Sequence, residues 1–232
     1  MRLSQILFSQ GFGSRRECSA LLGSGAVRVA GRVCDDPDED LPTYELVLTV
    51  NGQPWPFHDP AVVMLHKPAG VECSRQPGRH RSVMSLLPPP LRQRGVQPVG
   101  RLDQDTTGLL LLTDSGPLIH RLTSPKHHVA KVYEVVTKHA IDEAQMAALR
   151  AGVVLLDDPV PTAATTCEQV SERALRLTLT EGRYHQVKRM LAAVGNRVET
   201  LHRSAFGALQ LPADLLPGQW RWAAAADIET AA

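Results

Sequence analysis

Residues 100–108, with the sequence GRLDQDTTG, gather two carboxylates, one arginine and two glycines in a single short segment. Arg101 lies two residues before Asp103, and a nearby cation favours the charged form of a carboxyl group. An ionised carboxylate that is held in place can act as a nucleophile or a base at a sugar carbon. The same spacing fits a tight turn closed by an Asx-type hydrogen bond, and spacing alone favours that plainer alternative.

The elements that precede this segment begin with two short helices. Apolar residues at helical spacing start at Leu3 and the pattern stops at Gly11, which predicts the first helix. Ser14 followed three residues later by Glu17 is a capping-box arrangement. It predicts a second helix that ends at Gly23.

A stretch of turn formers divides the chain. Residues 51–56, with the sequence NGQPWP, are rich in residues that favour turns and loops. We place a domain boundary near residue 59, so that a small domain, 1–59, precedes a larger one, 60–232. The small domain is too short for a large core of its own and needs tight helix packing or its neighbour.

Strands and helices alternate irregularly along the chain. This order predicts an α+β fold with a mixed or antiparallel sheet rather than regular βαβ winding. The predicted strands are 26–29, 32–34, 46–50, 62–66, 109–112, 131–136 and 175–179. The predicted helices of the larger domain start at Ser82 (ended by the prolines 88–90), at 114–117, at Asp142 and at His185.

Charge is segregated although the formal net charge is only +1. Residues 1–34 hold five arginines and one glutamate, and 35–45 hold six acids and no base. Residues 61–101 hold seven bases and one glutamate. Separation of this kind suggests basic surfaces that could follow the phosphates of a nucleic acid.

Other features of the sequence restrict the class of protein. No apolar run approaches the roughly 20 residues that span a bilayer, and the first residues lack the pattern of a secretory signal. We therefore expect a cytoplasmic protein without a membrane partner. Cys18, Cys34, Cys73 and Cys167 form no C-x-x-C pair. They fit reduced structural thiols better than a disulfide framework or a zinc site.

Four motifs in the larger domain resemble the RsuA branch of the bacterial-type pseudouridine synthases. The GRLD sequence at 100–103 resembles the signature of that group, and 124–133, 181–190 and 201–203 follow in the family's order. The N-terminal segment, with SRR at 14–16 and GAVRV at 25–29, is similar to the S4 RNA-binding module. The resemblance implies a small S4-like domain, followed by a catalytic domain with a mixed, mainly antiparallel sheet.

The resemblance also implies roles for individual residues. Asp103 corresponds to the catalytic nucleophile of the family, and Tyr133 to the tyrosine that stacks against the target base. Lys188 matches the basic residue that pairs with the aspartate. The plainer alternatives are a half-buried strand tyrosine and a solvated helix lysine. We expect RNA contacts, to phosphate or base, from Arg15, Arg16, Arg28, Arg101, His185 and Arg189.

The reaction implied by the resemblance is the isomerisation of uridine to pseudouridine. The target nucleotide must leave the base stack, so we expect it to be flipped out. Asp103 could attack C1′ or remove the 2′ proton to give a glycal, and both routes stay open. The reaction needs no cofactor. His127, His128 and His185 lack a carboxylate or cysteine at ligand spacing, so we expect no metal.

The substrate implied by the resemblance is 16S, small-subunit ribosomal RNA, or an assembly intermediate of that subunit, acted on by a monomer. The RYHQ sequence at 183–186 and the His127-His128 pair look like the small-subunit type. Two alternatives stay open. One is a large-subunit enzyme of the same family, and the other is a non-catalytic S4-type protein that binds RNA or assists ribosome assembly.

Overall fold

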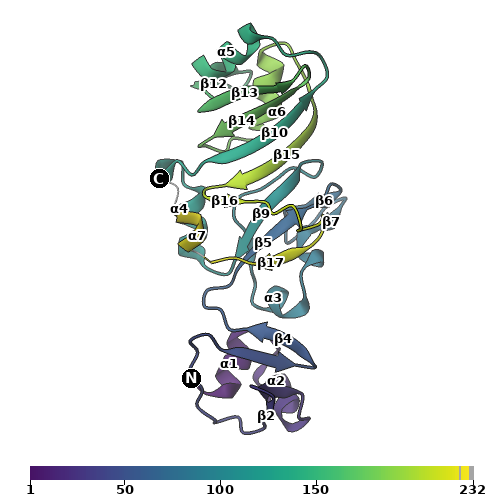
Figure 1. Ribbon diagram of the computed structural model, residues 1–232, viewed down its shortest axis with the longest axis vertical. Coiled ribbons are helices and arrows are strands. Elements are labelled where there is room, and N and C mark those ends of the chain that lie inside the picture. The colour runs from purple at the N-terminus through teal and green to yellow at the C-terminus, as the bar shows by residue number, and fades with distance from the viewer. Residues whose placement is uncertain (225, 230–232) are drawn as a thin grey trace. The chain divides into compact units, whose positions relative to one another are not determined.

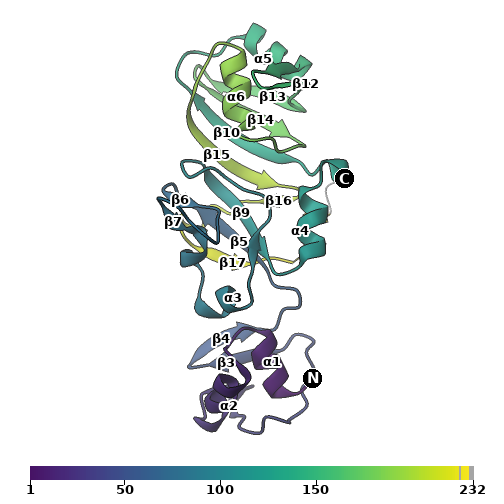
Figure 2. The same ribbon diagram turned by 180° about the vertical axis from the view of Figure 1, so that it is seen from behind.

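The computed structural model describes residues 1–224 and 226–229, and the chain forms two compact units (Figures 1 and 2). The first unit contains Met1–Ala61 and Leu87–Gln97. The second contains Val62–Leu86 and the chain from Pro98 onward. Segment 87–97 is thus packed with the N-terminal residues, which the sequence does not indicate. The division into domains 1–59 and 60–232 stays a prediction.

The first unit places two helices beside a four-stranded antiparallel sheet with the order β2-β1-β3-β4. The predicted capping box is confirmed, because the Ser14 hydroxyl accepts from Glu17 N–H and the Glu17 carboxylate accepts from Ser14 N–H. Leu3, Ile6 and Leu7 are fully buried, as their helical spacing predicts. The elements are α1 (Leu3–Ser9), α2 (Arg15–Gly23), β1 (Val27–Val29), β2 (Arg32–Val33), β3 (Val47–Val50), β4 (Gln53–Pro56) and α3 (Pro89–Gln93).

One local prediction is wrong, and another is incomplete. Of the turn formers at 51–56, Asn51 and Gly52 make the turn with positive φ angles, and the remaining four residues form strand β4 against β3. An Asn-Gly pair is typical of the tight turn of a hairpin, and an edge strand tolerates proline. The short helix expected between Ser82 and the prolines at 88–90 is confirmed as η1 (Val83–Leu86), which follows Ser82 and ends before the prolines. The same prolines also begin a second helix, α3, which was not predicted and has a proline in its first turn. Proline suits that position because its φ is already helical.

The second unit contains a nine-stranded mixed sheet among its described residues, with the main order β13-β14-β10-β15-β9-β5-β17. Neighbours along this order run antiparallel except β15 and β9, so the predicted α+β class with a mainly antiparallel sheet is confirmed. The elements are β5 (Val62–Lys67), β6 (Val71–Glu72), β7 (Arg81–Ser82), η1 (Val83–Leu86), β8 (Gln97–Pro98), β9 (Thr107–Thr113), α4 (Gly116–Thr123), η2 (Pro125–His127), β10 (Lys131–Thr137), α5 (Glu143–Ala151), β11 (Val153–Leu155), β12 (Asp158–Thr162), β13 (Thr166–Ser171), β14 (Ala174–Leu179), α6 (Gln186–Ala193), β15 (Val198–Phe206), β16 (Leu209–Gln210), β17 (Trp220–Trp222) and α7 (Ala226–Glu229).

Helices cover the sheet of the second unit in two places (Figures 1 and 2). Helices α5 and α6 pack beside β13, β14 and β10, around a core that contains Leu149, Leu177 and Met190. Helix α4 packs beside β9 around a second core with Leu109 and Leu111. Each fully buried leucine contributes about 2 kcal/mol through the apolar area removed from water. Among the described residues, no helix has the length and apolar character to cross a membrane.

Strands β9 and β15 meet in parallel between these two cores. Gly108 pairs with Arg203 in the register of the two strands and has a φ of +109°. A Cβ atom on Gly108 would lie 2.2 Å from the carbonyl oxygen of Arg203. Only glycine fits a position with that φ angle and that close a backbone. The junction fixes the loop before β9 relative to β15.

Candidate active site

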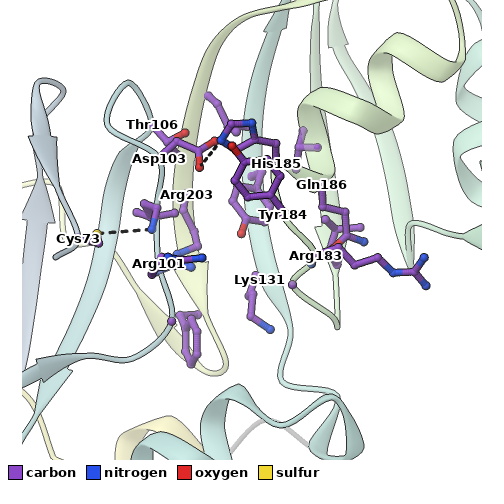
Figure 3. A pocket seen from close by; sticks show the side chains of 18 of the residues that line it. Cys73, Arg101, Asp103, Thr106, Lys131, Arg183, Tyr184, His185, Gln186 and Arg203 are labelled. Atoms are coloured by element: carbon purple, nitrogen blue, oxygen red, sulfur yellow. Dashed lines mark hydrogen bonds and ion pairs between the residues drawn. The ribbon is translucent and has the colours of Figure 1, made fainter. Parts of the chain in front are cut away.

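A cavity of about 470 Å³ lies in the second unit (Figure 3). Its lining comes mainly from the loop before β9, strand β10, the segment between β14 and α6, and β15, with further residues at 72–74 and at Thr123 of α4. The predicted site residues Arg101, Asp103, Tyr133 and His185 are all among its lining residues. The fold therefore brings together residues that lie up to 84 positions apart.

Asp103 lies in a loop whose backbone carbonyl groups bind a buried lysine, Lys67. The ammonium of Lys67, which is fully buried, donates hydrogen bonds to the carbonyl oxygens of Thr106 at 2.8 Å, Pro68 at 3.1 Å and Gln104 at 3.3 Å. Burial lowers the pKa of Lys67 below its usual range. Three carbonyl acceptors stabilise the buried cation, as such a group requires. The contacts set the path of the chain on both sides of Asp105.

The two oxygens of Asp103 face two basic side chains of the α6 region. Lys188 Nζ lies 3.1 Å from Oδ2, and His185 Nε2 lies 3.3 Å from Oδ1. Among residues 1–224 and 226–229 these are the ion partners of Asp103, so the inference that Arg101 supplies the neighbouring cation is wrong. The Arg101 side chain is exposed at the cavity. Two residues of separation along an extended loop did not bring its guanidinium to the carboxylate.

Lys188 also binds the second carboxylate of the loop. Its ammonium donates to Asp105 Oδ1 at 2.7 Å and Oδ2 at 2.9 Å. Burial lowers the pKa of Lys188, but the hydrogen bonds to Asp105 and Asp103 outweigh burial and raise it overall. Burial raises the pKa of Asp105, and the contact with Lys188 outweighs it and lowers that pKa. Asp105 was not among the predicted site residues, although it lies only two positions after Asp103 in the same motif.

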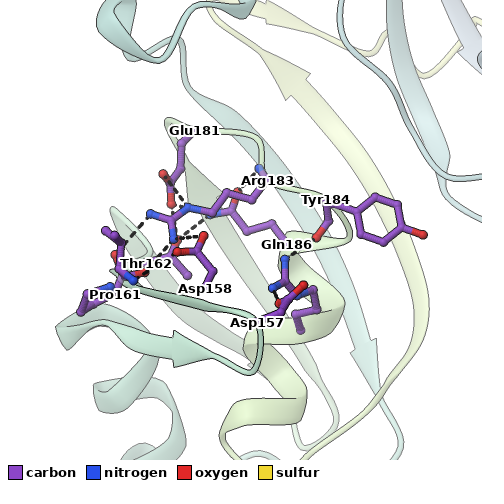
Figure 4. Close-up of polar contacts among 10 residues, drawn as sticks. Asp157, Asp158, Pro161, Thr162, Glu181, Arg183, Tyr184 and Gln186 are labelled. Carbon is purple, nitrogen blue, oxygen red and sulfur yellow. Dashed lines mark hydrogen bonds and ion pairs between the residues drawn. The ribbon is translucent and has the colours of Figure 1, made fainter.

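The segment before α6 is clamped to β12 by polar contacts (Figure 4). The Arg183 guanidinium donates to Asp158 Oδ2 at 2.8 Å, to Val160 O at 2.7 Å and to Glu181 Oε2 at 3.2 Å. The buried Gln186 amide donates to Glu181 Oε1 at 2.8 Å. These contacts fix the backbone on both sides of His185, which has the left-handed φ of +48°.

Arg189, which we predicted to contact RNA, is engaged within the protein. Its guanidinium donates to Tyr184 O at 3.0 Å and forms an ion pair with Asp157. An RNA contact from Arg189 would have to share these partners. In the structure, Arg189 holds the backbone of Tyr184, a residue that was not among the predicted site residues.

Two tyrosines lie at the cavity. Tyr133 is half-buried on β10, where it pairs with Leu177 of β14 and Arg203 of β15. Tyr184 is 68% exposed, and its ring stacks on His185 with a centroid distance of 3.8 Å and an interplanar angle of 19°. Exposed aromatic faces beside a carboxylate suit the stacking of a nucleobase.

Lys131 and Arg203 are two cationic residues that line the cavity and were not among the predicted site residues. Arg203 is 2% exposed, and its Nε donates to Leu109 O at 2.8 Å. Burial, together with the charge of Arg203, lowers the pKa of Lys131 to about 8. Both residues lie in motifs that carried the family resemblance, which was the available signal.

The remaining predicted RNA contacts lie in the first unit. Arg15, Arg16 and Arg28 are exposed on α2 and β1. The Arg15 guanidinium lies 6.0 Å from the centre of the Phe8 ring, which is 51% exposed. A cation beside an exposed aromatic ring is a combination that can bind a phosphate and a base together.

No cluster of three or more histidine, cysteine or acidic residues suited to a metal ion occurs in the described part of the chain. The imidazole of His185 faces a carboxylate. His127 and His128 are exposed at the end of η2, and His128 adopts a left-handed φ. All four cysteines are free thiols.

Two protein-family models match the chain. The model for RNA pseudouridylate synthases matches residues 61–193, and the model for the S4 domain matches residues 1–43. The first match contains Asp103, Tyr133 and Lys188. The second contains Arg15, Arg16 and Arg28.

Relatives of known class cover nearly the whole chain. An RNA pseudouridine synthase of Bacillus subtilis is 39% identical over 95% of this chain and 94% of that protein. The ribosomal small subunit pseudouridine synthase A of Pasteurella multocida is 37% identical over 99% of both chains. A crystal structure of a pseudouridylate synthase superimposes with a TM-score of 0.70 over the full length of both chains, at 33% identity. The chain therefore belongs to the RNA pseudouridylate synthase family and is of the RsuA type, in which an S4 domain precedes the pseudouridine synthase fold.

Proposed function

We propose that this enzyme isomerises a specific uridine of small-subunit (16S) ribosomal RNA to pseudouridine, with Asp103 as its nucleophile. The observation that carries the proposal is the placement of Asp103. Its carboxylate lies in a cavity that could receive a flipped nucleotide, and Lys188 and His185 face its two oxygens. The ammonium of Lys188, 3.1 Å from Oδ2, can hold the carboxylate in position for either route.

In this proposal the target nucleotide leaves its stack and enters the cavity. Tyr133 stacks against the base, and Lys188 holds the Asp103 carboxylate in place. Asp103 then attacks C1′ or removes the 2′ proton, and either route opens the C1′–N1 bond. The base turns and rejoins the sugar through C5. His185 and Arg101, at the cavity, contact the RNA around the target.

The choice of small-subunit RNA is supported by the relatives. The proteins of Pasteurella multocida and Vibrio cholerae that match this chain at 37% and 38% identity carry the name ribosomal small subunit pseudouridine synthase A. We propose the same substrate here, as free RNA or as an assembly intermediate. We also propose residues 1–59 and 60–232 as the two domains, a monomer, and a cytoplasmic location.

Arg15, Arg16 and Arg28 would hold the substrate from the S4 domain. They are exposed cations that form no ion pair with an acidic side chain in the described part of the chain, so their charges are available to phosphates. Binding through such contacts weakens with salt, because each neutralised phosphate releases counterions.

The experiment that tests the proposal measures tritium release from RNA that carries 5-tritiated uridine. Small-subunit and large-subunit RNA are supplied separately, each as free RNA and as partly assembled particles. Release from small-subunit substrate alone, at one mapped position, is the expected result. Release from large-subunit RNA alone would replace the substrate with the large-subunit alternative. Binding of RNA with no release from any substrate would favour the non-catalytic alternative.

A further inference from the structure

Two cations converge on one wall of the cavity. Lys131 of β10 and Arg203 of β15 both contact the face region of the Phe206 ring, with Nζ 5.4 Å and the guanidinium carbon 5.2 Å from the ring centre. All three residues line the same cavity as Asp103 (Figure 3). A basic wall therefore lies in the enclosure that holds the carboxylate.

The hydrogen-bonding capacity of this pair is incompletely used. Lys131 Nζ has three protons to donate, and within the described residues it donates one hydrogen bond, to Val129 O at 2.8 Å. Arg203 Nη2 is buried and has no hydrogen-bond partner. Within residues 1–224 and 226–229, neither side chain has an ion-pair partner. An unsatisfied buried donor costs about 1–3 kcal/mol, so the arrangement is unfavourable for the empty protein.

The carboxylate beside Lys131 is already engaged. Glu181 accepts hydrogen bonds from Arg183 at 3.2 Å and from Gln186 at 2.8 Å, and it also contacts the Thr162 hydroxyl. It therefore offsets the charge of Lys131 only in part. Consistent with this, burial and Arg203 lower the pKa of Lys131 to about 8. Replacement of incompletely paired buried charges by apolar residues often leaves a protein as stable or more stable, so a function explains this pair better than stability does.

The family reaction produces negative charge that would fit this wall. When the C1′–N1 bond opens, its electron pair leaves with the base. The charge is shared among N1, O2 and O4 of the detached uracil. C1′ meanwhile forms a bond to an oxygen of Asp103 or, after loss of the 2′ proton, a double bond to C2′. A pair from C5 then forms the C1′–C5 bond, while the bond between C1′ and Asp103 breaks or, on the other route, Asp103 returns the proton to C2′. The C5 proton passes to solvent, and N1 takes up a proton from solvent. Donors aimed at developing charge in an enclosed site commonly contribute a large share of catalysis.

We propose that Lys131, with Arg203 behind it, binds a carbonyl oxygen of the target uracil and stabilises the negative charge of the base while it is detached from the ribose. The inference rests on the proposed entry of the target uridine into this cavity. A phosphate oxygen could accept the same hydrogen bonds as a uracil carbonyl. The RNA backbone, however, continues on both sides of the target nucleotide, so its phosphates stay near the mouth of the cavity. Arg203 is only 2% exposed, and a flipped base can reach so buried a group more easily than a backbone phosphate can.

The test compares Lys131→Met and Lys131→Arg with Lys138→Met, which removes an exposed charge from the end of the same strand region. Tritium release from small-subunit RNA is measured in a single turnover with saturating enzyme, and RNA affinity is measured over a range of salt concentrations. Lys131→Met is expected to lower the saturating rate by about 100-fold. Lys131→Arg should restore most of the rate, and Lys138→Met should match the wild type. RNA affinity and its salt dependence should stay within about two-fold of the wild type in all three, because the contact is with the base rather than phosphate.

Thermal melting separates this role from a structural one. Lys131→Met should melt at or above the wild-type temperature, because it removes a partly buried charge that has no ion-pair partner among the described residues. A lower melting temperature, with the rate restored on cooling, would overturn the inference in favour of a structural lysine. An unchanged saturating rate with weaker RNA binding and a salt slope reduced by about one would assign Lys131 to a phosphate instead.

The wild type keeps this test distinct from that of the proposed function. An inactive wild type would overturn the proposed function and the inference together. An active wild type with an equally active Lys131→Met variant would overturn the inference alone.

Discussion

Lys188 Nζ lies 3.1 Å from Asp103 Oδ2 and at the same time 2.7 Å from Oδ1 of a second carboxylate, Asp105. One cation therefore serves two anions in the same loop. This divided contact makes the position of the ammonium depend on both carboxylates. It also distinguishes the residue from an exposed helix lysine, because 27% of the Lys188 side chain is accessible.

Removal of the Lys188 charge should lower the rate more than it lowers RNA affinity. Lys188→Met leaves two carboxylates, Asp103 and Asp105, without their shared cation, and Asp103 loses the contact that holds Oδ2 in place. We expect the single-turnover rate of tritium release to fall by about 10²-fold or more, a range typical of the loss of one electrostatic contact in an active site.

Lys188→Arg is the matched control, and it should retain a measurable part of the rate because it keeps the charge. An exposed lysine, changed in Lys138→Met, reports the effect of a lost surface charge. If Lys188→Met kept the wild-type rate, the ion pair with Asp103 would have no part in the reaction.

Gly108→Ala should destabilise the second unit. The new Cβ would lie 2.2 Å from Arg203 O, and the φ of +109° is one that alanine rarely adopts. We expect a loss above about 3 kcal/mol in the free energy of unfolding, because strain and overpacking act together. Chemical denaturation followed by circular dichroism measures the loss.

Gly116→Ala is the control for this prediction, because Gly116 is in the first turn of α4 with open space around its Cβ position. We expect that change to be neutral or slightly stabilising. Equal stability of the two variants would contradict the close approach of β9 and β15.

The activity of the wild type should decline as pH rises through about 8. The pKa of Lys131 is lowered to about 8 by burial and by Arg203 of β15, against the opposing charge of Glu181. Because the pKa is lowered, the cationic form is present below this pH and is lost above it. We expect kcat/KM for tritium release to fall up to about ten-fold per pH unit in this range, as for an essential protonated group.

Lys131→Arg should move this decline to higher pH, since arginine stays charged throughout. A decline at the same pH in both proteins would assign it to another group, and Lys131 would then not be the group that titrates.

Arg15→Ala and Arg16→Ala should weaken RNA binding and reduce its dependence on salt. Each arginine that contacts a phosphate contributes about 0.7–0.9 to the slope of log affinity against log salt concentration. Filter binding with small-subunit RNA at several salt concentrations measures the slope. Ser19→Ala on the same helix is an uncharged control. A slope equal to that of the wild type in the double variant would exclude phosphate contacts from this pair.

Local patterns predicted much of the fold. The capping box at Ser14 and Glu17 predicted α2, and the continuous apolar run after Gly108 predicted β9, because both signals act over a few residues. The short helix between Ser82 and the prolines at 88–90 was predicted, but α3 was not, since proline can start a helix as well as follow its end. The inclusion of 87–97 in the first unit depends on tertiary contacts, which no local pattern encodes.

The candidate site was predicted in part, and mainly through resemblance. Spacing suggested Arg101 as the cation near Asp103, whereas the fold supplies Lys188 from 85 positions further along the chain. The start of α6 near His185 was predicted, and the resemblance pointed to Lys188, but the sheet order that brings the two segments together is not revealed by local patterns. Lys131 and Arg203 stand out only once their burial and their incomplete hydrogen bonding are known.

The most direct test of the account compares the wild type with Asp103→Asn in tritium release from small-subunit RNA that carries 5-tritiated uridine. The substitution is nearly isosteric and removes the charge that Lys188 and His185 face. The account predicts release by the wild type and none by the variant, with RNA binding and thermal stability close to those of the wild type. Release at the wild-type rate by Asp103→Asn would contradict the assignment of Asp103 as nucleophile.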